Sequence, residues 1–124
     1  MKQADRILGN AHVLTMDDSY RAYPRGAVAL YGSTIAAVGD EAELRREWQA
    51  AEVVDCGGRV LMPGLVNAHT HVPMTLLRGL TDDRRLDVWL LGYMMPVERE
   101  FVSPDFCRLV TLLACAEMIL CGVT

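Results

Sequence analysis

The stretch that decides how this chain is interpreted is LMPGLVNAHTH, residues 61–71. Apart from its turn residues and one asparagine, residues 60–68 are apolar, which is typical of a strand buried on both faces. The stretch ends in His69 and His71. On an extended strand, side chains two residues apart leave the same face, so the two imidazoles can converge on one ion. The pattern therefore predicts a buried strand with two metal ligands at its C-terminal end.

Neutral imidazole nitrogen is a good ligand for both zinc and ferrous iron. A catalytic zinc site usually has three protein ligands and a water. The remaining histidine, His12, lies between Ala11 and Val13, and we interpret it as a solvent-facing strand residue. The pair is therefore half of a site. We expect it to hold one divalent metal ion, with zinc as the first choice and iron as the alternative.

Before Arg59, short runs rich in β-forming residues alternate with turn residues. A Gly32-Ser33 pair predicts a tight hairpin turn, and Asp40 can cap a helix over residues 41–48. The predicted strands are residues 6–16, 26–31, 34–38 and 52–55.

After the histidines, the sequence predicts short helical pieces at residues 73–78 and 82–91, the second ending near Gly92. Ser103 as a cap, Pro104 at the first helical position and Gly122 as a terminator define a longer helix.

This longer helix is apolar around most of its circumference, so we expect neighbours to cover it on more than one side. Glu117 on it should pair with an arginine or a backbone group, because an unpaired buried acid is costly. We interpret Arg78 and the Asp82-Asp83 pair as solvated loop charges or local ion pairs.

Composition excludes several classes of function. The chain has 124 residues, 52% of them hydrophobic, and a net charge of −4 without a long basic block, which argues against nucleic acid as a partner. The most apolar window, residues 106–121, contains two charges and is shorter than the ~20 residues of a membrane span. The N-terminus lacks a secretory signal, so we expect a cytoplasmic protein. The four cysteines form no C-x-x-C pair and are interpreted as reduced core residues.

The string in residues 61–71 resembles the P-G-h-h-[ND]-x-H-x-H signature (h, apolar) of the amidohydrolase superfamily. Residues 74–80, 87–90, 96–98, 114–119 and 122–124 are similar to one branch of it. That branch holds methylthioadenosine/S-adenosylhomocysteine deaminases, guanine-type deaminases and triazine hydrolases. The resemblance extends over nearly the whole chain and is strongest from Val60 onward.

This resemblance implies an α/β fold: the N-terminal part of a (β/α)8 metal-dependent hydrolase barrel, preceded by part of a small β-sandwich. Residues 1–59 would be the partial sandwich, completed by strands from later in the chain. Residues 60–124 would be the first barrel strand and the helices that follow it. A whole barrel needs ~250 residues, so we expect a truncated barrel that requires its remainder.

The same resemblance implies roles for four residues. His69 and His71 match the two metal-ligand histidines of the first strand. Glu98, in a Pro-x-Glu context, matches an acid that holds ribose hydroxyls, and Trp89 matches an aromatic residue of the substrate pocket. From the residues alone, Glu98 could equally be an exposed acid at a helix start, and Trp89 a core aromatic. The third histidine ligand and the proton-transfer residues of the family lie on later strands, so no catalytic residue is assigned here.

The resemblance therefore implies an enzyme, a metal-dependent aminohydrolase. It would deaminate an adenosine-type nucleoside, methylthioadenosine or S-adenosylhomocysteine, by attack of a metal-bound water. These 124 residues alone are expected to be inactive. The alternatives are a triazine or guanine-type aminohydrolase or chlorohydrolase, or a small non-catalytic structural or metal-binding module. The expected partner is a small molecule, a purine nucleoside or a triazine, and homo-oligomerisation is left open.

Overall fold

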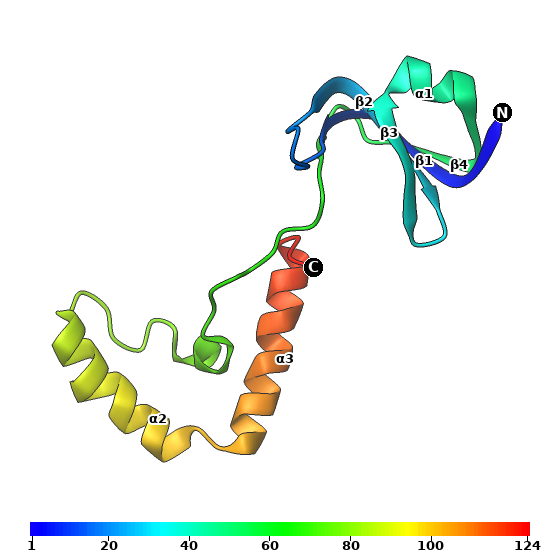
Figure 1. Cartoon of the computed structure of the whole chain (residues 1–124). Coiled ribbons are helices and arrows are strands. Elements are labelled where there is room, and N and C mark those ends of the chain that lie inside the picture. Colours follow the sequence, from blue (N-terminus) through cyan, green and yellow to red (C-terminus); the bar gives the residue numbers. More distant parts are fainter. The chain divides into compact units, whose positions relative to one another are not determined.

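Strands make up most of the first part of the chain and helices most of the second (Figure 1). The computed structural model describes residues 1–124 and divides them into two units, Met1–Pro63 and Gly64–Thr124. The sequence-based boundary lies between residues 59 and 60. Residues 60–63 group instead with the first unit, where β5 (Val60–Leu61) pairs in parallel with β1 (Lys2–Leu14).

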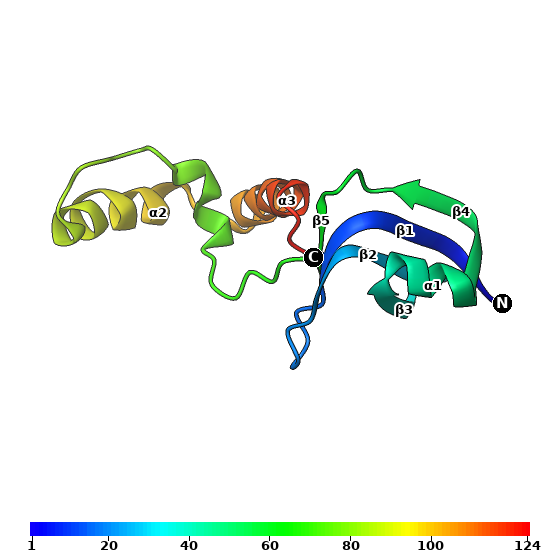
Figure 2. The same ribbon diagram turned by 90° about the horizontal axis from the view of Figure 1, so that it is seen from above.

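The first unit is built on a five-stranded sheet that contains β1, β2 (Ala22–Tyr31), β3 (Thr34–Asp40) and β4 (Trp48–Asp55). The strand order is β3-β2-β1-β4, with β5 also paired to β1. β1, β2 and β3 are antiparallel neighbours, whereas β4 runs parallel to β1 (Figure 2). The four strands predicted from the sequence are present and differ from the observed ones only at their ends. The predicted hairpin turn is confirmed: β2 and β3 pair as far as Tyr31 and Thr34, and Gly32 has a φ of +55°.

The first unit has two buried clusters, and one of them lies between the sheet and a short helix, α1 (Glu41–Glu47). Ile7, Ala27 and Ala29 are buried and pack with Leu44, the buried residue of the helix. Three small or branched side chains on two neighbouring strands leave room for one leucine from the helix. α1 is thereby held against the sheet.

The chain leaves β4 through a turn that Asp55 organises. Its carboxylate accepts hydrogen bonds from the backbone N–H of Gly57, at 2.8 Å, and from the Asn10 side chain, at 2.7 Å. These two hydrogen bonds favour the ionised form and lower the pKa of Asp55. The turn fixes the route from β4 back along β1 to β5.

The predicted buried strand over residues 60–68 is wrong in extent. Only Val60 and Leu61 form a ladder, and Val66 is 82% exposed. The next strand-like contact is a single parallel bridge between Leu65 and Val123. A buried parallel strand needs a neighbour on each edge, and Pro63 has no N–H to donate to one. Within this chain, residues 122–124 are the only backbone that pairs with residues 64–66, so the ladder stops there.

The second predicted helical piece does not end at Gly92. A π-helical segment, η2 (Val88–Met94), continues directly into α2 (Met95–Phe101). Its wide turns are marked by the Met95 N–H, which bonds to the Leu90 carbonyl five residues back. Pro96 explains this, because a proline lacks the N–H for a regular helical bond and its ring clashes with the carbonyl four residues earlier. The first piece is a 3₁₀ helix, η1 (Val72–Leu77).

The predicted long helix is confirmed as α3 (Pro104–Leu120). The Ser103 hydroxyl accepts from the Phe106 N–H at 3.1 Å, and Gly122 follows the helix at a φ of +83°. The helix packs on η1 but buries only Val110 and Ala114. The expectation of cover on more than one side is therefore not met within this chain. Its exposed large apolar residues are Leu109, Leu112, Leu113, Ile119 and Leu120.

None of the helices combines the length and the apolar character that crossing a bilayer requires. All four cysteines are free, and Cys56 packs against a core cluster, but the prediction that all four are core residues is wrong. Cys56 and Cys107 are half-buried, and Cys115 and Cys121 are exposed. The exposed pair lies on or just after the face of α3 that this chain leaves uncovered.

The cap of α1 gives a first prediction. The Asp40 carboxylate accepts hydrogen bonds from the backbone N–H of Ala42, at 2.9 Å, and of Glu43, at 3.3 Å. Asp40→Ala should lower the free energy of unfolding by about 1 kcal/mol, measured by urea titration, because both donors lose their acceptor. Asp40→Ser keeps an acceptor and should stay within a few tenths of a kcal/mol of the parent. Equal losses in the two variants would mean that the cap oxygen does not hold the helix start.

The contact between Gly64 and the end of the chain gives a second prediction. A Cβ at Gly64 would lie 2.8 Å from the Thr124 Cβ, so Gly64→Ala forces the two backbones apart. We expect a loss of about 1–3 kcal/mol in the free energy of unfolding. Gly92→Ala is the control: no atom lies within 4 Å of its Cβ position, and alanine favours a helix. The prediction fails if both alanine variants are as stable as the parent.

Candidate metal centre

The two histidines of the H-x-H pair converge, although no strand carries them. His69 Nε2 lies 3.3 Å from His71 Nε2, and the ring centroids are 5.4 Å apart with their planes tilted by 43°. Both residues lie in irregular backbone just before η1, and both are exposed. The predicted convergence of the two rings is thus observed, but it is produced by a loop rather than by strand periodicity.

The separation of the two nitrogens matches what one metal ion would impose. Two imidazole nitrogens at about 2.1 Å from a tetrahedral zinc ion are about 3.4 Å apart. The observed 3.3 Å, which is also a hydrogen-bond distance between the two rings, is close to that value, so the spacing of the two Nε2 atoms is compatible with one shared ion. No group of three or more metal-binding side chains occurs in this chain. The pair therefore fits two positions of a metal site and leaves the others open.

Short hydrogen bonds on either side of the pair fix its backbone. The Asn67 side-chain oxygen accepts from the His69 N–H at 3.1 Å. Beyond the pair, the Met74 N–H donates to the His71 carbonyl at 2.8 Å, which starts η1. The asparagine and the 3₁₀ turn thus bracket the two histidines.

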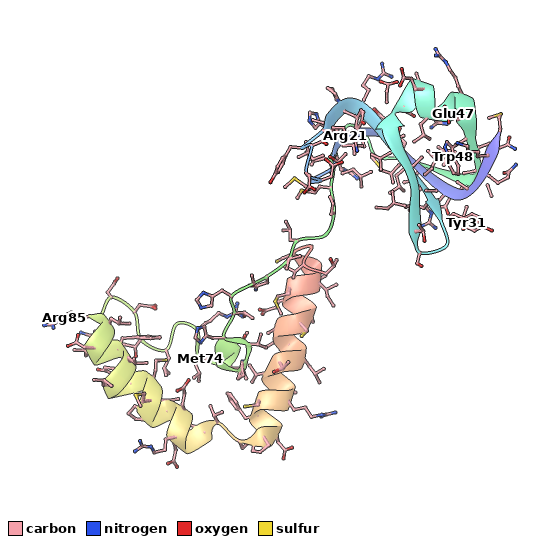
Figure 3. All side chains as sticks on the ribbon, in the orientation of Figure 1. Arg21, Tyr31, Glu47, Trp48, Met74 and Arg85 are labelled. Atoms are coloured by element: carbon pink, nitrogen blue, oxygen red, sulfur yellow. The ribbon has the colours of Figure 1, made fainter.

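Three of the four predicted site residues line one hollow of about 600 Å³, and the fourth, His69, is joined to it through its contact with His71. This hollow lies in the second unit, and Met74, labelled in Figure 3, projects from η1 at its wall. The full lining is His71, Met74, Thr75, Leu77, Arg78, Trp89, Leu90, Met94 and Glu98. η1 supplies one side of the hollow, and the helix formed by η2 and α2 supplies the other.

The walls of the hollow are mostly apolar, with a few polar groups. Met94 is almost fully buried, Trp89 and Glu98 are half-buried, and the histidine ring stands at one end. An apolar wall with a few converging polar groups is typical of a small-molecule site. Trp89 and Glu98 therefore lie where a ligand in this hollow would meet them.

The sequence interpretation missed Arg78. The sequence predicts a solvated loop charge or a local ion pair there, yet the guanidinium Nη2 of Arg78 lies 2.8 and 2.9 Å from the two carboxylate oxygens of Glu117. The one available signal came from the other partner, because an acid on an apolar helix needs an arginine or a backbone group. That part of the prediction is confirmed, although Glu117 is half-buried rather than buried.

Comparison with known proteins gives a consistent result. The Amidohydrolase family model matches residues 60–124. A 5-methylthioadenosine/S-adenosylhomocysteine deaminase of Nitratidesulfovibrio vulgaris is 46% identical over 120 residues, which cover 97% of this chain and 27% of that protein. A 5'-deoxyadenosine deaminase of Methanosarcina mazei is 42% identical over 121 residues, covering 98% of this chain and 27% of that protein. The chain thus spans less than a third of the length of the curated relatives it matches.

Solved structures agree with these relatives. An adenosine deaminase from Xanthomonas campestris with bound zinc superposes with a TM-score of 0.83 at 40% identity, over 99% of this chain and 28% of that one. A variant of atrazine chlorohydrolase from Arthrobacter aurescens, in complex with zinc and atraton, gives a TM-score of 0.76 at 25% identity. That match covers 96% of this chain and 27% of the chlorohydrolase.

The histidine geometry gives a third prediction. In the full-length protein, replacing both His69 and His71 with alanine should remove the bound metal, measured by inductively coupled plasma mass spectrometry. The far-UV circular dichroism spectrum should not change, because both rings are exposed and leave no cavity. His12→Ala is the matched control and should keep its metal. An unchanged metal content in the double variant would refute the assignment of this pair.

Proposed function

Because this chain belongs to the amidohydrolase family, we propose that it forms the N-terminal part of a metal-dependent enzyme that deaminates an adenosine-type nucleoside by hydrolysis. The proposed substrates are methylthioadenosine and S-adenosylhomocysteine. The observation that carries the proposal is the pair of Nε2 atoms 3.3 Å apart at one end of a hollow that also contains Trp89 and Glu98. By themselves, these 124 residues are proposed to be inactive.

The connectivity of the second unit fits the start of a (β/α)8 barrel, with the segment around Leu65 as its first strand. Leu65 and Val123 pair in parallel, and the chain between them contains α3, which is the connectivity of a strand-helix-strand unit. Barrel active sites lie at the C-terminal ends of the strands, and His69 and His71 follow the paired residue in that direction. We accordingly propose residues 60–124 as the start of the barrel and residues 1–59 as part of a composite β-sandwich.

Zinc is the proposed metal. Its preference for imidazole nitrogen and tetrahedral geometry agrees with the spacing of the two Nε2 atoms, and two of the solved relatives contain it. Such an ion supplies Lewis acidity that brings the pKa of a water molecule toward neutrality. Within this chain, His69 and His71 would hold the ion.

Glu98 and Trp89 are the proposed substrate-binding residues. The Glu98 carboxylate, half-buried at the wall of the hollow, can accept hydrogen bonds from a pair of ribose hydroxyls. Trp89 offers a flat apolar face, and Leu90 and Met94 beside it exclude water from a bound purine. The hollow thus has a place for a sugar and a place for a base.

The alternative substrates, a triazine or a free guanine-type base, have no ribose for Glu98 to bind. The relatives described as deaminases of adenosine derivatives are 38–46% identical to this chain, against 25% for the chlorohydrolase. The higher identity to the deaminases favours a nucleoside as the substrate. The cytoplasmic location expected from the sequence stays part of the proposal.

Glu98 gives the fourth prediction. In the full-length enzyme, Glu98→Gln should raise the KM for methylthioadenosine about tenfold or more, because hydrogen bonds from hydroxyls to a charged acceptor are the strong ones. The KM for adenine or a triazine should change little, since these lack ribose. Glu100→Gln, an exposed neighbour outside the hollow, is the matched control. Equal effects on nucleoside and free base would mean that Glu98 does not bind the sugar.

The proposed reaction itself is tested by ammonia release from methylthioadenosine in the full-length, zinc-loaded enzyme. A measurable turnover of the nucleoside, absent in the His69→Ala/His71→Ala variant, is the expected result. Turnover of a chlorotriazine without turnover of any nucleoside would replace this proposal with the chlorohydrolase alternative.

A further inference from the structure

An ion pair ties the segment after the histidines to α3. Arg78, the C-cap residue that follows η1, places its Nη2 atom 2.8 and 2.9 Å from the two carboxylate oxygens of Glu117. Its Nε atom also donates to the Thr75 carbonyl at 3.0 Å, so the guanidinium is held from both η1 and α3. The ion pair thereby joins η1 to α3 through two residues that lie 39 positions apart in sequence.

The segment before the histidines is tied to the same end of α3. The Asn67 side-chain nitrogen lies 3.5 Å from the Met118 sulfur, and the Leu65 N–H donates to the Gly122 carbonyl at 2.8 Å. Asn67 is also the residue that accepts from the His69 N–H. Residues 117–122 thus hold the histidine segment on both its sides.

Between these two attachments, His69 and His71 have no strand partner. Asn67 and η1 bring the two rings together, and where this pair lies on α3 depends on how the ends of residues 67–78 are fixed. We propose that Arg78 and Glu117 are positioning residues, whose ion pair holds the histidine segment on α3 so that both imidazoles face one metal ion. The metal part of this inference rests on the proposed function.

The expected size of the effect follows from exposure. The side chains of Arg78 and Glu117 are 66% and 40% exposed, and ion pairs in such settings change an equilibrium constant by a factor of about five at most. Losing the pair should therefore shift part of the population to a state in which the histidines are misplaced. The apparent metal affinity falls in proportion to the competent fraction.

The experiment compares Arg78→Met, Glu117→Gln and the double variant of the full-length protein. Hydrogen exchange, read by mass spectrometry on a peptide over residues 67–78 of the metal-free protein, reports whether the segment is held. Competition with a chromophoric chelator reports the zinc dissociation constant. Arg78→Lys is a further variant, which keeps the charge and should recover part of the affinity.

A matched control breaks another exposed ion pair. Arg6 on β1 and Glu52 on β4 form such a pair in the first unit, with Arg6 Nη2 2.7 Å from Glu52 Oε2. Their side chains are 51% and 53% exposed. Glu52→Gln should leave both the exchange of residues 67–78 and the zinc dissociation constant unchanged. It thereby corrects for the general effect of removing a surface charge.

We expect faster exchange over residues 67–78 and zinc binding weakened by up to about fivefold in each single variant, with no further loss in the double variant. Unchanged exchange in both single variants would overturn the inference. So would faster exchange with unchanged zinc affinity, because the pair would then hold the segment without positioning the ligands. If the parent binds no zinc, the proposed function fails, and the exchange measurement alone decides whether the pair holds the segment.

Discussion

The second unit depends on the backbone hydrogen bonds that join residues 64–66 to residues 122–124. The Leu65 N–H donates to the Gly122 carbonyl, and the Thr124 N–H donates to the Leu65 carbonyl. These bonds close a long loop of chain that contains η1, η2, α2 and α3, so they bring the histidine segment to the end of α3. Gly64 permits this approach because its missing Cβ leaves room for Thr124. The same end of α3 also carries the partners of Asn67 and Arg78, Met118 and Glu117.

Features set by local chemistry were predictable from the sequence. The caps at Asp40 and Ser103, the Gly32 hairpin and the end of α3 at Gly122 each depend on a few neighbouring residues, and all were confirmed. The extent of the strand before the histidines was not, because a strand forms only where a second backbone pairs with it, and that information lies far away in sequence. The partner of Arg78 could not be predicted from its local sequence for the same reason, because Glu117 lies on another element.

The candidate site is a case in which a correct expectation came from an incorrect structural premise. The two histidines were expected to converge because they lie two apart on a strand, and they do converge, yet through a loop fixed by Asn67 and η1. The clustering of Trp89 and Glu98 with His71 came from the family resemblance, since nothing in their spacing on a regular helix would bring them together. The local pattern gave the residue types, and the resemblance supplied the long-range geometry.

The π-helical segment decides which way Glu98 faces. Trp89 and Glu98 are nine positions apart, about two and a half turns of a regular α-helix, which would direct them to opposite sides. The wider turns of η2 use more residues for each revolution, so Glu98 lags in rotation and reaches the side on which Trp89 lies. By preventing regular α-helical winding, the proline thus changes the rotation of Glu98 about the helix axis relative to Trp89. One helix can then present an aromatic face and a carboxylate to the same bound molecule.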